Sequence, residues 1–139
     1  MIRTLLTLAA GIGIGAMAMA AAHDEGVRVT PIAERNIVEK LDGMEAKATV
    51  VEVTLEPGQA GVPHRHPGPG FGYVLEGEYE WAVDDQPAKV LKVGETFYEP
   101  TGCLHRVSKN PSAKGKTRIL AVVLHPRDAE QIAIPEPKK

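Results

Sequence analysis

The sequence has very little cysteine, few aromatic residues and no excess of basic charge. Cys103 is the single cysteine, and the aromatic residues are two phenylalanines, one tryptophan and three tyrosines in 139 residues. One cysteine excludes an intramolecular disulfide, so the fold must be held together by packing of its Val, Ile, Leu and Ala side chains. With 16 Lys and Arg against 18 Asp and Glu, the formal net charge is −2, which argues against nucleic acid or an anionic membrane as a partner.

One long apolar run is present, at the N-terminus. Residues 4–22 carry no charge, follow Arg3 and end in a series of alanines. A basic start, an apolar middle and a small-residue exit are typical of a secretory signal peptide. The alternative is an uncleaved anchor, because about 20 apolar residues can span a bilayer. Since Ala and Gly dominate the second half, we expect residues 1–22 to be cleaved, leaving a periplasmic or secreted protein without stable membrane insertion.

The remainder is patterned as strands and turns. Residues 47–55 are rich in β-branched side chains and stop before Pro57-Gly58, which is typical of a strand followed by a turn. A hairpin is predicted around Gly77, and alternation in its second arm places Tyr79, Trp81 and Val83 on one face. Further short strands are predicted at 71–76, 88–91, 95–99, 104–108 and 117–125.

Seven or eight short strands without an amphipathic helix favour an all-β jelly roll or closed barrel. We divide the chain into the signal peptide, an N-terminal strand segment at 23–46, a barrel at 47–125 and a C-terminal tail at 126–139. The tail contains proline and charge, and we expect it to be a surface helix turn or a loose extension.

Three of the five histidines are candidate metal ligands. His64 and His66 are two residues apart, so in an extended strand their side chains project from the same face. His105 begins another predicted strand, after a tight turn that contains Gly102. A lone His-x-His in a Gly- and Pro-rich loop is more often a pair of surface histidines, and the motifs around it decide between the two interpretations.

Two such motifs resemble those of the cupin superfamily. The first runs from Gly58 through His64-Arg65-His66 to Gly77, and the second from Gly94 through Pro100, Gly102 and His105 to Asn110. The resemblance implies a double-stranded β-helix of the jelly-roll type, a homodimer, and a divalent metal held by His64, His66 and His105. The metal would be Fe, Mn, Ni, Zn or Cu.

The sequence departs from the family pattern at one ligand. Cupins usually carry a glutamate or glutamine separated from the second histidine by three or four residues, and Gly70 and Phe71 occupy those places. Asn110 also lies one residue later than the pattern expects. The resemblance thus leaves a neutral three-imidazole site, which is a stronger Lewis acid than one with a carboxylate. Losing the ligand can equally mean weak or absent metal binding.

Other residues are candidates for supporting roles. Gln59 or Glu99 could provide a fourth ligand or orient an imidazole. Tyr73, Glu99 and His125 are the candidate catalytic residues, although turn, core and strand-end positions explain them equally well. Cys103 shares the face of His105, and its expected role is that of a small buried residue.

Two functions follow from these residues. The first is an exported metal-dependent enzyme, an oxygenase, isomerase or lyase that uses the metal as a Lewis acid on a small molecule. The alternative is a non-catalytic periplasmic module that binds a metal or a small ligand. Bound metal with exchangeable water and turnover of a substrate would separate them.

Overall fold

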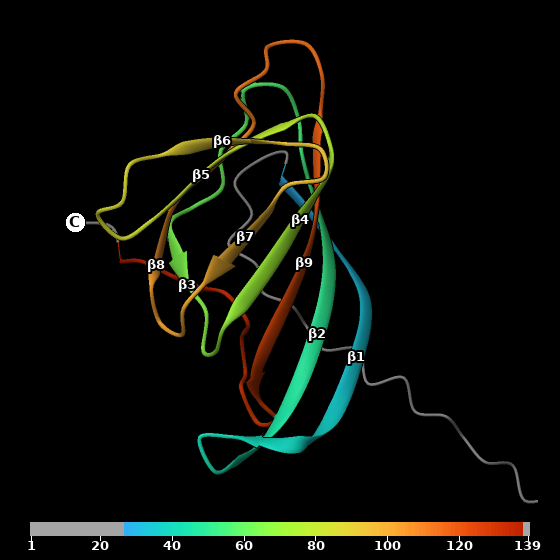
Figure 1. Ribbon diagram of the computed structural model, residues 1–139, viewed down its shortest axis with the longest axis vertical. Coiled ribbons are helices and arrows are strands. Elements are labelled where there is room, and N and C mark those ends of the chain that lie inside the picture. The colour runs from blue at the N-terminus through green and yellow to red at the C-terminus, as the bar shows by residue number, and fades with distance from the viewer. Residues whose placement is uncertain (1–26, 138–139) are drawn as a thin grey trace, which may run out of the picture.

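The computed structural model describes residues 27–137, and every regular element in this part of the chain is a β-strand (Figure 1). The predicted signal peptide lies outside the described residues. No helix within 27–137 is long and apolar enough to cross a membrane. The strands are β1 (Val27–Leu41), β2 (Met44–Leu55), β3 (His64–Arg65), β4 (Gly70–Glu76), β5 (Glu78–Val83), β6 (Lys89–Lys92), β7 (Thr96–Glu99), β8 (Leu104–Lys109), β9 (Thr117–Pro126) and β10 (Ile134–Pro135).

The strands form two five-stranded antiparallel sheets that face each other. One sheet has the order β1-β2-β9-β4-β7, and the other has the order β10-β3-β8-β5-β6. The chain crosses repeatedly between the sheets, as it does in a double-stranded β-helix of the jelly-roll type. This is the all-β architecture that the strand and turn pattern predicts.

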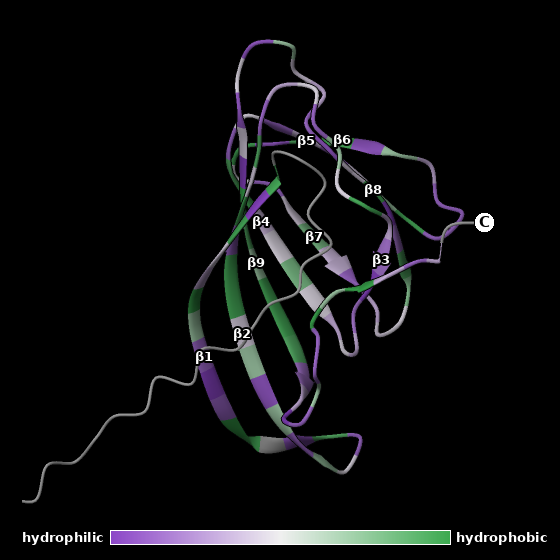
Figure 2. Cartoon of the chain, turned by 180° about the vertical axis from the view of Figure 1, so that it is seen from behind, coloured by the Kyte–Doolittle hydropathy of each residue, from purple (hydrophilic) through white to green (hydrophobic). Residues whose placement is uncertain are grey.

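The core lies between the sheets, where side chains of one face of each strand meet. Tyr79, Trp81 and Val83 are all buried, which confirms the alternation predicted for β5. Gly77 makes the preceding turn with a φ of +75°, a conformation that glycine adopts without steric cost. In Figure 2 hydrophobic colour follows β9 and forms bands across β2, which matches strands with one buried face.

The N-terminal strand is longer than the sequence pattern indicates. The 15-residue β1 pairs with β2 as a sheet edge and has register shifts after Pro31 and Ile37. Proline is tolerated at an edge because its missing N–H faces away from the sheet. Mixed charge, the proline and the shifts all obscure the two-residue period by which strands are recognised.

The C-terminal tail differs from the expected surface helix turn or loose extension. Residues 134–135 form β10, which pairs with β3, and the Glu136 amide donates to the Pro63 carbonyl at 2.8 Å. Arg65 contacts Glu136, with 3.0 Å between Nε and Oε2. The tail is therefore tied to the strand that carries the first histidine.

Candidate metal centre

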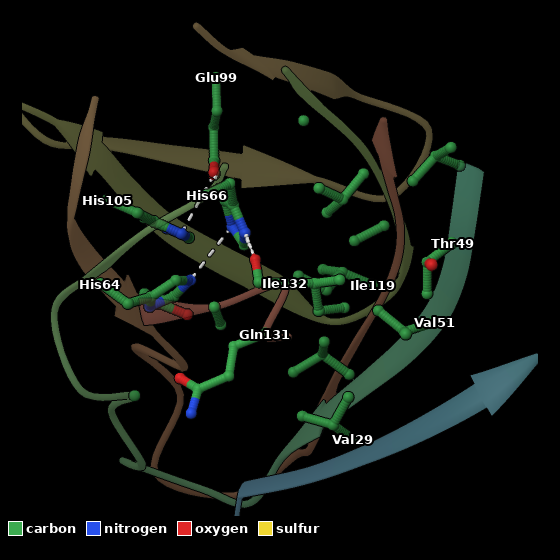
Figure 3. Close-up of a pocket in the computed structure, with 18 of the residues that line it drawn as sticks. Val29, Thr49, Val51, His64, His66, Glu99, His105, Ile119, Gln131 and Ile132 are labelled. Atoms are coloured by element: carbon green, nitrogen blue, oxygen red, sulfur yellow. Dashed lines mark hydrogen bonds and ion pairs between the residues drawn. The ribbon is translucent and has the colours of Figure 1, made fainter. Parts of the chain in front are cut away.

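The structure brings the three predicted histidines together at one end of the space between the sheets. His64 in β3 pairs directly with His105 in β8, and His66 follows β3 by one residue. One nitrogen from each imidazole lies within 4.8 Å of the others, and the Nε2 atoms of His64 and His66 are 3.2 Å apart. Figure 3 shows the rings pointing toward one another.

The outer nitrogens of His64 and His66 are each bonded to a backbone carbonyl. Nδ1 of His64 lies 2.8 Å from the Val62 oxygen, and Nδ1 of His66 is hydrogen-bonded to the Ile132 oxygen in the tail. A carbonyl only accepts, so each Nδ1 must carry the proton and donate it. In the neutral form of each ring the lone pair is then on Nε2, which faces the cluster.

His105 has the reverse tautomer for a similar reason. The Tyr79 hydroxyl donates to the Ser108 hydroxyl oxygen at 2.8 Å, and it lies 3.2 Å from Nε2 of His105. With the tyrosine proton donated to Ser108, Nε2 of His105 donates to the tyrosine oxygen. The lone pair of His105 is therefore on Nδ1, which is buried and has no hydrogen bond of acceptable geometry among the described residues.

A carboxylate completes the cluster. Glu99, at the end of β7, is 2% exposed. Its Oε2 lies 3.2 Å from Nε2 of His66, and its Oε1 lies 3.1 Å from Nδ1 of His105 and accepts a hydrogen bond of 3.0 Å from Trp81. The neutral three-imidazole set expected from the motif is thus joined by a negative charge.

The ionisation of these groups follows from burial and from their mutual charges. Burial raises the pKa of Glu99, but hydrogen bonds from His66 and Trp81 and the charges of His105 and His66 outweigh it and lower the pKa to about 2. Burial lowers the pKa of His105 to about 4 and, together with His66, lowers that of His64. Burial acts the same way on His66, but contact with Glu99 outweighs it and raises its pKa.

The lone pairs of the three imidazoles and the Glu99 carboxylate fit a divalent cation better than a proton. A proton on Nε2 of His66 is shared between Glu99 and His64, and it leaves Nδ1 of His105 without a partner. A metal ion would accept all of these lone pairs. Neighbouring ligands on an ion with bonds of about 2.1 Å lie about 3.0–3.4 Å apart, and the contacts of 3.1–3.2 Å have this spacing.

The cluster forms one wall of a cavity of about 160 Å³. Figure 3 shows aliphatic side chains from Val29, Val51 and Ile119 on the opposite side, with Ile132 of the tail between them and the histidines. The cavity thus joins a polar, histidine-lined end to an apolar body.

The other predicted candidates lie apart from this cluster. The side-chain oxygen of Gln59 accepts a hydrogen bond of 2.9 Å from the Glu56 amide in a turn. Tyr73 is 43% exposed on the outer face of β4. His125 is fully buried and bonds to Thr49 at 2.8 Å, on the far side of the cavity lining. None of the three is brought to the histidine cluster.

Cys103 is 8% exposed and packs in the hydrophobic core. Burial, with the charges of Glu99 and Asp84, raises the pKa of Cys103 to about 11. It is a buried thiol, in agreement with the structural role expected for it.

Sequence reasoning missed Tyr79 and Ile132 as partners of the histidines. The burial of Tyr79 was predictable from alternation, but its contact with His105 depends on which strands are neighbours. Ile132 acts through its carbonyl, and no side-chain pattern reports that.

Residues 51–123 match the cupin domain family (Cupin_2), and this match spans more than half of the chain. The chain belongs to the cupin family. No curated protein matches the sequence.

Solved structures share the fold at low sequence identity. A conserved protein with a double-stranded β-helix domain from Klebsiella pneumoniae is 22% identical, with a TM-score of 0.62 over 83% of this chain and 89% of its own. KdgF from Halomonas sp. is 20% identical, with a TM-score of 0.59 over 76% and 84% of the two chains. The DMSP lyase DddQ from Ruegeria pomeroyi is 20% identical, with a TM-score of 0.54 over 66% and 45%. These likenesses establish the double-stranded β-helix fold.

Proposed function

We propose that this cupin is an exported metal-dependent enzyme that acts on a small molecule bound between the three-histidine centre and the apolar cavity. Export rests on the basic, apolar and small-residue pattern of residues 1–22. A divalent ion held by His64, His66 and His105 would supply Lewis-acid chemistry.

The observation that carries the proposal is the hydrogen bonding behind the three imidazoles. Val62, Ile132 and Tyr79 each accept from the outer nitrogen of one ring, so that three lone pairs converge. Metal-binding histidines almost always donate their second N–H in this way, which fixes the tautomer and the ring orientation. Unrelated surface histidines have no reason to share this arrangement.

The cavity indicates the class of substrate. An apolar cavity of about 150 Å³ in another protein accepts benzene, and this one has a volume of about 160 Å³. We infer a compact apolar body of about six carbons with an oxygen-bearing group that reaches the histidine end. Only Glu99, of the three catalytic candidates, lies where it can contact such a group. The DMSP lyase with the same fold is an enzyme by name, which favours catalysis over simple binding.

The test is elemental analysis of untagged protein from its native compartment, alongside the variants His64→Ala and His105→Ala. We expect near-stoichiometric divalent metal in the wild type and its loss from both variants, with the β-sheet circular dichroism retained. Gln59→Ala is the control, because Gln59 lies outside the cluster, and its metal content should be unchanged. Unchanged metal in both histidine variants would contradict the proposed centre. Metal without turnover of any small oxygen-bearing compound would favour the binding module.

A further inference from the structure

The position that usually holds the cupin carboxylate is empty of a side chain and faces another carboxylate. Gly70 in β4 pairs with Glu99 in β7, and both residues are buried. A Cβ built on Gly70 would lie 3.5 Å from both Cβ and Oε2 of Glu99, and 3.8 Å from the His66 ring. The Glu99 side chain therefore borders the space into which a side chain at position 70 would project.

The orientation of the Glu99 carboxylate is fixed by contacts with three side chains. Trp81, on β5 of the opposite sheet, donates its indole N–H to Oε1 at 3.0 Å. The carboxylate meets His66 through Oε2 and His105 through Oε1. A buried charge requires partners of this kind, because desolvation of an unpaired carboxylate costs several kcal/mol.

A purely supporting role, in which Glu99 accepts a proton from a metal-binding histidine, does not fit the tautomers. The nitrogens of His66 and His105 that face Glu99 are the ones left with lone pairs, because their other nitrogens donate to Ile132 and Tyr79. A proton on His66 would explain one contact of Glu99 and leave the contact with His105 as two facing lone pairs. A cation shared by all three groups explains both.

We propose that Glu99 is the carboxylate ligand of the metal centre, supplied from β7 across the sheet in place of the glutamate that cupins usually carry on β4. This inference rests on the proposed three-histidine centre. It changes the ligand set from three neutral imidazoles to three imidazoles and one carboxylate. The net charge of the centre with a bound divalent ion falls from +2 to +1.

The added carboxylate should matter most for harder ions. Imidazole suits zinc, copper and nickel, whereas carboxylate suits manganese, which stands at the weak end of the affinity series for divalent ions. Binding of Mn²⁺ should therefore depend on Glu99 more strongly than binding of Zn²⁺ does.

The experiment compares dissociation constants of Mn²⁺ and Zn²⁺, measured by competition with a chromophoric chelator. Glu99→Gln keeps an oxygen that can accept the hydrogen bond from Trp81. We expect this variant to weaken the binding of Mn²⁺ by at least about 100-fold and the binding of Zn²⁺ by a smaller factor. Glu80→Gln is the matched control, because Glu80 lies on β5 with 29% of its side chain exposed and contacts Lys109. It should leave both constants unchanged.

A second variant moves the carboxylate back to β4. Gly70 has no positive φ, so its backbone accepts a side chain, and Glu99→Ala clears the space in front of it. The double variant Gly70→Glu with Glu99→Ala should recover most of the Mn²⁺ affinity that Glu99→Ala alone loses. A crystal structure of wild-type protein with Zn²⁺ should place an oxygen of Glu99 about 2.0–2.2 Å from the ion.

The outcomes separate this inference from the metal centre itself. Metal bound by wild type, with equal constants in Glu99→Gln or a Glu99 oxygen beyond 3 Å from the ion, would overturn the ligand role and leave the histidine centre intact. Failure of the wild type to bind either ion would overturn both.

Discussion

Gly72 is the position near the proposed metal centre at which one added methyl group should destabilise the fold most. It lies on the inner face of β4, two residues after Gly70, and faces Phe97 in β7. A Cβ on Gly72 would lie 1.9 Å from Cζ of Phe97 and 2.1 Å from Cε1, inside the ring. The same addition at Gly70 meets Glu99 at 3.5 Å, an ordinary contact. Although the two glycines share one face of one strand, alanine should destabilise the fold at Gly72 and be tolerated at Gly70.

The size of the effect follows from how far the ring must move. Carbon atoms pack best at about 3.5–4.0 Å, so the Phe97 ring must shift by about 1.5 Å or more. Its neighbours are the rings of Tyr79 and Trp81, with centroids 5.4 and 5.6 Å away, so little space is free. Overpacking costs about 1–3 kcal/mol and complete loss of a buried Phe about 3–5 kcal/mol. We expect Gly72→Ala to destabilise the fold by about 2–4 kcal/mol.

Urea denaturation and thermal unfolding measure this cost. Gly72→Ala should lower Tm by about 8–16 °C for a domain of this size, whereas Gly70→Ala should match wild type within about 1 kcal/mol. Adding Phe97→Leu to Gly72→Ala should restore part of the loss, with a coupling energy of at least about 1 kcal/mol. If Gly72→Ala unfolds within about 0.5 kcal/mol of Gly70→Ala, the packing of Phe97 against β4 is refuted.

Two other predictions concern pH and the tail. Metal-stripped protein should lose stability as pH falls from 6.5 to about 4, because the pKa of His105 is lowered to about 4 in the fold and an unfolded histidine takes up its proton at 6.5. The loss is on the order of 3 kcal/mol, partly offset by His66, whose pKa is raised, and it continues below pH 4.5 as Glu99 approaches its pKa of about 2. Urea midpoints at pH 7.5 and 4.5 measure it, and equal midpoints would contradict the burial of neutral His105. Ending the chain at residue 130 removes the Ile132 carbonyl from His66 and should weaken metal binding about 10–100-fold. In the control Glu136→Ala, which removes only an exposed ion pair, metal binding should be nearly unchanged, and equal affinity in the truncated chain would exclude this role for Ile132.

The parts of the site that were predictable depend on short-range geometry. Side chains two residues apart share a face of a strand, so His64 and His66 could be paired from the sequence alone. Their meeting with His105 came from the resemblance to two cupin motifs, and the structure accounts for it by direct pairing of His64 with His105. The inner face of β5 was predictable because its alternation is regular.

The parts that were missed depend on which strands are neighbours. Tyr79 reaches His105 because β5 pairs with β8, and the carbonyl of Ile132 reaches His66 because the tail adds a strand beside β3. Neither pairing has a local signature. A two-residue strand such as β10 is also too short for any periodicity to reveal it.

Glu99 shows what kind of signal could have been used. Taken alone, a glutamate before Pro100 has the features of a turn residue facing solvent. Its position in the strand argues otherwise, because Phe97 and Glu99 share a face and Phe97 is an obvious core residue. A glutamate on a core face needs a buried partner. Because Gly70 provides no carboxylate ligand, the histidine cluster is the partner to expect for Glu99. The absence of a carboxylate at Gly70 and the buried carboxylate at Glu99 therefore have one explanation, in which Glu99 takes the place of the usual ligand. The signal for such a replacement is an inward-facing acidic residue on the strand that pairs with the position of the missing ligand.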